Sequence, residues 1–172
     1  MSLRALLLAS VLAPASLLAQ RGVVNWASGP FGTPDDPAFV IERDRIHMAV
    51  GPFGERGRCL WIFQGEQVFR AVGSYGSKGA CAYALDGNRF LRCEGAFCTK
   101  SGCVFALEQD RPGVLKVHHA EGAFCNRMNG GFVIEGNVVY LAEGPFANKG
   151  DAILVLPADA PLVAVLAILA GL

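Results

Sequence analysis

The sequence lacks the short motifs that usually mark an active site. It has no G-x-S-x-G nucleophile turn, no phosphate-binding loop, no zincin motif and no C-x₂-C pair for a metal. Histidine is scarce, with only His47, His118 and His119. The last two are adjacent, and neighbouring side chains of a strand point to opposite faces. The sequence therefore favours a non-catalytic protein, without metal or cofactor, over an enzyme.

The chain also lacks an excess of charge of either sign. Lys and Arg total 15, as do Asp and Glu, so the formal net charge is zero. Nucleic-acid binding requires a positive field that displaces counterions, so this balance argues against it. The C-terminal apolar run, residues 162–172, has eleven residues. A helix needs about 20 residues to cross a bilayer, so we expect no stable membrane span.

The N-terminus has the layout of a secretory signal peptide. Residues 1–19 carry one charge, Arg4, followed by an almost wholly apolar stretch, and cleavage is expected near Gln20. A single domain, residues 20–157, and an apolar tail, residues 158–172, then remain. Six cysteines fit an oxidising compartment, and their even number predicts disulfides with no free thiol. We therefore expect a secreted, extracellular protein.

The main organising feature is a 22-residue repeat. Similar segments, such as VGPFG at residue 50 and EGAFC at residue 94, begin at intervals of 22, 22, 22, 27 and 22 residues. The repeats are residues 28–49, 50–71, 72–93, 94–120, 121–142 and 143–157. The five extra residues of the fourth repeat surround residues 110–113, which read as a turn.

The columns of the repeat predict two strands in each copy. Position 2 is always glycine and position 4 is always aromatic, which we interpret as a special backbone angle beside a buried ring. The aromatic residues are Phe31, Phe53, Tyr75, Phe97, Phe124 and Phe146. Positions 11 to 14 are apolar, as expected for a strand covered on both faces. An acidic-Gly turn and a second strand with an apolar position 19 follow.

The two ends of the repeat region complement each other. Residues 23–27 match a second strand, whereas the sixth repeat has a first strand at residues 152–156 and then Pro157 and Pro161. Pairing of these two ends would close a ring and remove the sheet edges. The sequence thus predicts an all-β closed toroid of six two-stranded units, propeller-like or β-trefoil-like. The alternative is a short parallel β-helix of about six coils.

The cysteines also follow the repeat. Cys59, Cys81 and Cys103 share position 10, Cys98 and Cys125 share position 5, and Cys93 is at position 22. Six cysteines allow fifteen pairings, and the sequence does not choose among them. We favour a Cys98–Cys125 bond between neighbouring repeats. Positions 10 and 22 also face each other, which brings Cys81 opposite Cys93.

The candidate ligand-binding residues come from two columns of the connecting loops. Position 7 is basic in five repeats, and position 1 is glutamate in three. The residues are Arg56, Lys78, Lys100, Arg127 and Lys149, with Glu94, Glu121 and Glu143. On a ring these loops would share one rim, and cations, carboxylates and aromatic rings together are suited to sugars. The other interpretation of the basic column is a solvated rim.

The predicted function is therefore multivalent, lectin-like binding of an extracellular glycan. The alternatives are a secreted effector that engages a host protein, and a structural protein of a cell wall or matrix. The tail leaves two possibilities open. It is either a GPI-attachment signal, preceded by the small residues 158–160, or a segment that packs on the domain or fills the axis of the ring.

Overall fold

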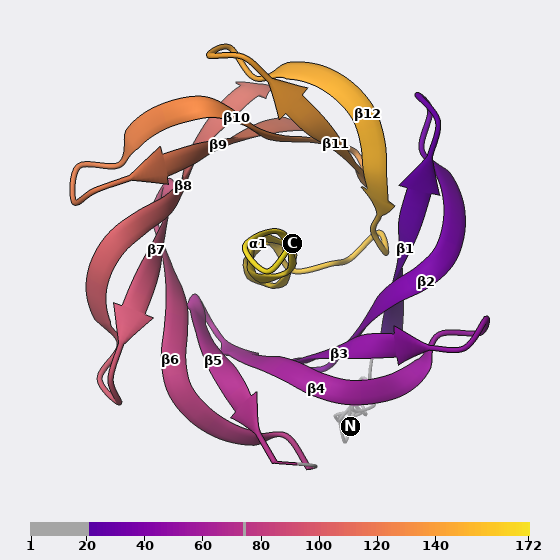
Figure 1. Ribbon diagram of the computed structural model, residues 1–172, viewed down its shortest axis with the longest axis vertical. Helices are drawn as coiled ribbons and strands as arrows, with labels where there is room; N and C mark the ends of the chain where they lie inside the picture. The colour runs from indigo at the N-terminus through magenta and orange to yellow at the C-terminus, as the bar shows by residue number, and fades with distance from the viewer. Residues whose placement is uncertain (1–20, 74) are drawn as a thin grey trace, which may run out of the picture.

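The structure is a computed structural model that describes residues 21–73 and 75–172, so the predicted signal peptide, residues 1–19, lies outside the described residues. The described chain forms twelve strands in one closed ring around a single helix (Figure 1). The strands are β1 (Arg21–Ser28), β2 (Thr33–Glu42), β3 (Arg45–Val50), β4 (Glu55–Gln64), β5 (Gln67–Val72), β6 (Ser77–Asp86), β7 (Arg89–Glu94), β8 (Thr99–Arg111), β9 (Val114–Glu121), β10 (Asn126–Glu135), β11 (Val138–Glu143) and β12 (Asn148–Val155). The helix is α1 (Leu162–Leu169).

The ring is closed by pairing between the two ends of the repeat region. Strand β1 is antiparallel to β12, with Asn25 opposite Val155 and Trp26 opposite Leu154. This confirms the closed toroid and the predicted pairing of residues 23–27 with residues 152–156. Every neighbouring pair of strands is antiparallel, which excludes the parallel β-helix. The six units are joined in one continuous sheet, so the described strands have no unpaired edge.

The inner face of the ring is lined by large apolar side chains. Position 19 of each unit is 0% exposed in all six cases. These residues are Val24, Ile46, Val68, Phe90, Val117 and Val139. Rings from position 12, such as Tyr83 and Phe105, pack on Phe90 with centroids 5.2 Å and 6.1 Å away. The alternation of the strands therefore places one apolar column of each repeat toward the axis.

Helix α1 fills the axis of this ring (Figure 1). Seven of its eight residues, from Val163 to Leu169, are buried. A helix that is apolar on every side is stable only when it is surrounded, and here the ring surrounds it. Its end lies against the wall, because a Cβ added to Gly171 would be 2.5 Å from the Trp61 ring. The apolar tail therefore belongs to the central core.

Smaller apolar clusters cover the outer face where neighbouring repeats meet. One contains Phe69, Cys81, Ala84, Cys93 and Cys98, and the next contains the equivalent residues one repeat later. These clusters on the outer face explain why the first strand of each repeat is apolar on both faces. Each repeat buries its outer face only against its neighbour, so the stability of the ring depends on the contacts between repeats.

The disulfides differ from the predicted pairing. Cys81 is bonded to Cys98 and Cys103 to Cys125, so the Cys98–Cys125 bond was wrong. Position 5 has a left-handed backbone, with φ of 51° at Cys98 and 53° at Cys125. This conformation directs its side chain back to position 10 of the preceding repeat, not to its equivalent in the next one. Both bonds therefore connect adjacent repeats.

Two cysteines, Cys59 and Cys93, are buried and unbonded, which contradicts the expectation that no thiol is free. Cys93 packs in the same outer cluster as the Cys81–Cys98 bond. Burial raises the pKa of both thiols, so they stay protonated and poorly nucleophilic at neutral pH. They act here as small apolar side chains.

Candidate functional site

The aromatic residues at position 4 are exposed, which corrects the expectation that their rings are buried. Their exposed fractions run from 74% at Phe146 to 96% at Phe97. They stand on four-residue turns between strands, which we call the tips. The tips are residues 29–32, 51–54, 73–76, 95–98, 122–125 and 144–147, of which the structure describes all but residue 74. Figure 1 shows these turns projecting outward around the ring.

The geometry of the tips explains why the rings point outward. In five of them the amide of position 5 donates a hydrogen bond to the carbonyl of position 2, as Gly54 does to Gly51 at 3.3 Å. Positions 2 and 5 both have positive φ, for example 69° at Gly51 and 66° at Gly54. Position 5 packs against the preceding repeat and is buried in five tips and half-buried at Cys125. Position 4 is left at the outer end.

The basic residues of position 7 bind side chains of the preceding repeat. Each donates to the side chain at position 15 of that repeat, and Lys100 Nζ, for example, lies 2.9 Å from Asp86 Oδ2. The pairs are Arg56 with Glu42, Lys78 with Gln64, Lys100 with Asp86, Arg127 with Glu108 and Lys149 with Glu135. At the ring closure, where the sixth repeat meets the first, position 7 is Pro34 and position 15 is Pro157. Neither the basic residue nor its partner is therefore present there.

Further contacts hold the same cations in place. Lys78 Nζ lies 4.1 Å from the centre of the Phe69 ring, and Lys149 Nζ lies 4.3 Å from that of Tyr140. Hydrogen bonds from Lys100 and Arg127 lower the pKa of Asp86 and Glu108, respectively. The structure thus uses the basic column in contacts between repeats.

The candidate glutamates divide between two places. Glu94 and Glu121 line a cavity of about 670 Å³ between two neighbouring strand pairs, β7–β8 and β9–β10. We call this cavity the trough. Glu143 lines a separate hollow of about 480 Å³ with Lys149 and Asp151. All three glutamates are exposed.

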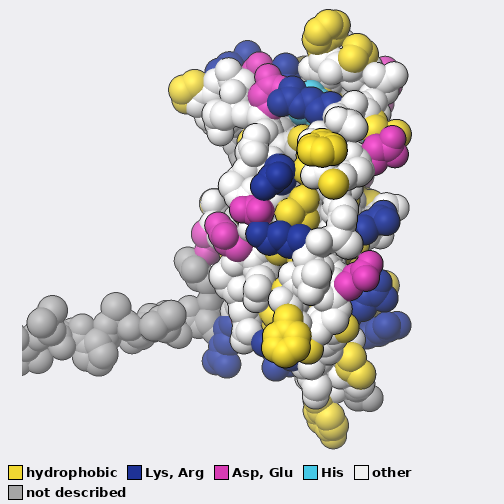
Figure 2. Space-filling model, turned by 90° about the vertical axis from the view of Figure 1, so that its left-hand side faces the viewer, with side chains coloured by type: hydrophobic (Ala, Val, Ile, Leu, Met, Phe, Trp, Pro, Cys, Tyr) yellow, Lys and Arg dark blue, Asp and Glu magenta, His cyan; other side chains and the backbone are white. Residues whose placement is uncertain are grey.

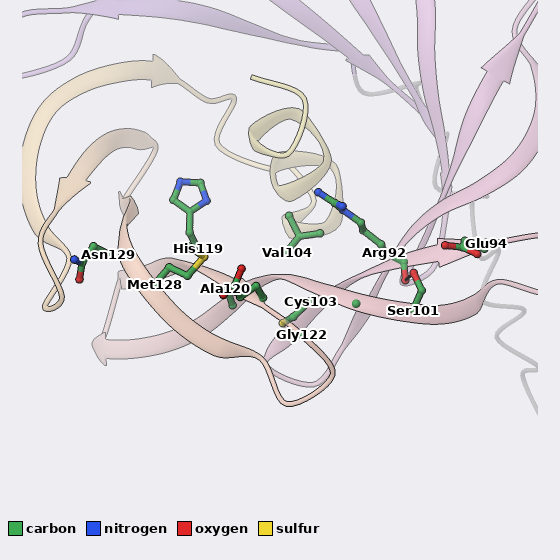
Figure 3. A pocket seen from close by; sticks show the side chains of 12 residues that line it. Arg92, Glu94, Ser101, Cys103, Val104, His119, Ala120, Gly122, Met128 and Asn129 are labelled. Carbon is green, nitrogen blue, oxygen red and sulfur yellow. Dashed lines mark hydrogen bonds between the residues drawn. The ribbon is translucent and has the colours of Figure 1, made fainter.

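The trough has an apolar floor and polar sides. Val104, Ala120 and Met128 contribute apolar groups to it. Figure 3 shows Arg92 and His119 on either side of Val104, with Ser101 and Glu94 beyond Arg92 and Asn129 at the opposite end. The His119 ring is held by packing, with the Phe105 and Phe132 rings both 5.5 Å away.

Three charged side chains of the trough are unpaired within the described residues. Among residues 21–73 and 75–172, the side chains of Arg92, Glu94 and Glu121 make no hydrogen bond or ion pair. Ser101 Oγ donates to the Arg92 carbonyl at 3.5 Å. The contrast with the basic column is clear, because there each cation already has a partner within the protein.

The other two histidines are buried in the structure. His47 and His118 occupy position 20 and are 8% and 2% exposed, so both are packed inside the protein. Burial lowers the pKa of His118, and the nearby Arg127 lowers it further. His118 Nε2 lies 3.3 Å from Glu108 Oε2.

Sequence reasoning missed Arg92, His119 and Asn129 as site residues. Arg92 and His119 occupy position 21, which is apolar at Trp26, Met48 and Leu141 but basic at Arg70 and Arg92 and histidine at 119. The change at position 21 from Trp26 and Met48 to Arg92 and His119 was the available signal. This change points to a site only because Glu94 and Glu121 line the same cavity, and that placement is known only from the folded ring.

Comparisons with known proteins do not extend these observations. No family model, curated protein or solved structure matches the chain. In the described part of the chain, no group of three or more His, Cys, Asp or Glu residues has the arrangement of a metal site. No helix within residues 21–73 and 75–172 is long and apolar enough to cross a membrane.

Proposed function

We propose that the protein is a secreted, non-catalytic module that binds carbohydrate, with its principal site in the trough. The observation that carries this proposal is the set of unpaired polar side chains around an apolar floor. Two disulfides are compatible with an extracellular location, since such bonds persist in oxidising compartments.

The chemistry of the trough suits a ligand rich in hydroxyl groups. Carboxylates accept hydrogen bonds, a guanidinium donates them, and the amide of Asn129 does both. A hydroxyl needs a donor and an acceptor, so the mixture of Arg92, Glu94 and Glu121 is better matched to a sugar than to a simple anion. Val104 and Met128 offer an apolar surface for the C–H face of a sugar ring.

Multivalency is the second part of the proposal. Glu143 begins the sixth repeat as Glu94 and Glu121 begin the fourth and fifth, and it lines a hollow of its own. Two weak sites on one rigid ring can act together on a polymeric ligand, and avidity can exceed single-site affinity by about 10²–10⁴-fold. The basic column is a secondary candidate, because its charges are already engaged within the protein.

A glycan array with matched variants tests the proposal. We expect Arg92→Ala and Glu121→Gln to weaken binding at least about tenfold, which corresponds to the loss of one charge-assisted hydrogen bond. Arg70→Ala is the control, because Arg70 is exposed at position 21 but lies outside the trough. Lys78→Ala, Lys100→Ala and Arg127→Ala should leave binding nearly unchanged. If no glycan binds, or if the trough and control variants behave alike, the proposal is wrong.

A second candidate function is recognition of a host protein. Its support is an apolar arc at position 21 on the other part of the ring, where Trp26, Met48 and Leu141 are 42%, 49% and 45% exposed. Aromatic residues and methionine are enriched at protein interfaces. Binding of a protein partner that is lost in Trp26→Ser and retained in Arg92→Ala would favour this candidate over the first.

A further inference from the structure

The six tips differ chemically from the trough. Their 24 positions hold only Gly, Pro, Ala, Ser, Cys, Phe and Tyr, so none of them carries a charge. A tip offers a hydroxyl-rich ligand an aromatic face but almost no side-chain hydrogen bond. Isolated exposed apolar residues are normal, but the same exposed aromatic position in six repeats calls for a partner that is itself apolar.

We infer that the tips are contacts between copies of this chain, which associate edge to edge into planar assemblies. Figure 1, which looks along the axis of the ring, shows the tips projecting outward all around its rim. In the edge-on view of Figure 2, hydrophobic groups likewise stand out at both ends of the long axis. A second ring in the same plane can meet one tip with another, and further rings can do so around the whole rim.

The tips are built to keep the aromatic rings outside. Position 5 is anchored in the preceding repeat, through a disulfide at Cys98 and at Cys125. The turn hydrogen bonds and glycines fix the backbone behind the ring. A rigid presentation reduces the conformational entropy lost on association.

The charge of the chain also permits self-association. The formal net charge is zero, from 15 basic and 15 acidic residues, so copies do not repel one another over long distances. Proteins near zero net charge associate more readily than strongly charged ones. The uncharged tips add no local repulsion where two rings would meet.

The size of one contact predicts how assembly should depend on concentration. An aromatic side chain buries about 150–250 Å², so two tips in contact bury on the order of 300–500 Å². A stable pair of proteins usually needs about 1,200–2,000 Å². A dimer held by one such contact should therefore be weak. A ring that contacts several neighbours at once should stay in the assembly, because all of its contacts must break together. We expect monomers below a threshold concentration and large, flat assemblies above it.

Sedimentation velocity and electron microscopy over a range of concentrations test this inference. The test variant replaces all six aromatic tip residues by serine, and Trp26→Ser is the control, because Trp26 is exposed but lies outside the tips. The wild type and the control should assemble above a threshold, and the six-tip variant should remain monomeric at a concentration at least tenfold higher. A variant with serine at Phe31, Tyr75 and Phe124 should have an intermediate threshold.

Two results would overturn the inference. One is a wild type that stays monomeric over the whole range, and the other is a six-tip variant that assembles as readily as the wild type. A circular dichroism spectrum like that of the wild type verifies that the six-tip variant is folded. Its glycan binding reports on the trough independently, so failure of the assembly and failure of the proposed function are distinguishable.

Discussion

Gly76 lies beside Cys59 in the same way that Cys98 lies beside Cys81 one repeat later. A Cβ added to Gly76 would lie 2.7 Å from Cys59 Cβ and 2.9 Å from its Sγ. Both tip residues have positive φ, 63° at Gly76 and 51° at Cys98. The second repeat therefore retains one half of an inter-repeat disulfide, and glycine replaces the other half.

The first prediction is that Gly76→Cys forms a third disulfide, with Cys59. The two Cβ atoms must separate by about 1 Å to reach the mean disulfide value of about 3.8 Å. The left-handed backbone is the same as at Cys98, so the fold already tolerates cysteine there. The loop is as long as that of the Cys81–Cys98 bond, whose residues are 17 apart, and could contribute about 3 kcal/mol before strain is subtracted.

Thiol titration of the denatured, unreduced protein checks this prediction. The wild type should show two thiols, and Gly76→Cys should show one and melt at a higher temperature. Gly76→Ser is the matched control, since it introduces a side chain of similar size without the bond and should melt lower than the wild type. Three thiols in Gly76→Cys would contradict the prediction.

The second prediction concerns the dependence of stability on pH. Because burial lowers the pKa of His118 in the folded state, this residue accepts a proton more readily in the unfolded chain. The folded state is therefore favoured above the unfolded pKa of about 6.5, and this contribution is lost as the pH falls below it. The nearby Glu108 carboxylate reduces the effect, whereas Arg127 and Lys116 increase it.

Urea unfolding at pH 7.5 and pH 5.0 measures this contribution. His118→Leu, which copies Leu91 at the same repeat position, should lose less stability between the two pH values than the wild type. The exposed His119 provides the control, and His119→Leu should lose about as much as the wild type. Equal losses in the wild type and His118→Leu would contradict the prediction.

The third prediction is that α1 carries much of the stability of the ring. Leu166 is 0% exposed, so Leu166→Ala leaves a cavity inside the ring. Substitutions of this kind cost about 2.7–5 kcal/mol. Leu172 is 55% exposed, and Leu172→Ala should change the free energy of unfolding by less than about 0.5 kcal/mol. Urea unfolding distinguishes the two, and similar effects of both substitutions would place α1 outside the core.

The fourth prediction is that removal of residues 20–27 destabilises the whole domain. Strand β1 pairs with both β2 and β12, so its loss opens the ring and exposes the edge of each. In hydrogen exchange, protection should fall in strands far from the deletion, including β6 and β7. Loss of protection restricted to β2 and β12 would show that the ring does not unfold as one cooperative unit.

The repeat columns predicted the strands and the closure because both depend on periodic patterns. An apolar residue at position 19 in six units, including Val24 before the first repeat, was enough to predict that residues 23–27 complete the ring. The two prolines after residue 156 likewise showed that the last unit lacks its second strand. These are local properties of the chain, and side-chain alternation converts them into faces of a sheet.

The candidate site was only partly predictable. Glu94 and Glu121 came from a repeated column, but Arg92 and His119 lie in a column of mixed residue types and gave no repeated signal. The basic column was visible, yet its partners at position 15 lie 14 residues earlier in four of the five pairs and 19 earlier for Arg127. Only the packing of one repeat on the next shows that each of these cations already has a partner.

The sequence alone thus determined the number of repeats, the two strands in each and the closure of the ring. The tertiary structure decided where the tip side chains point, which cysteines bond, and which charges remain unpaired. For the tips and the cysteines, the physical reason is the backbone at position 5. Its left-handed φ turns Cys98 inward toward Cys81 and leaves Phe97 in solvent, and a column of residue types does not show that angle.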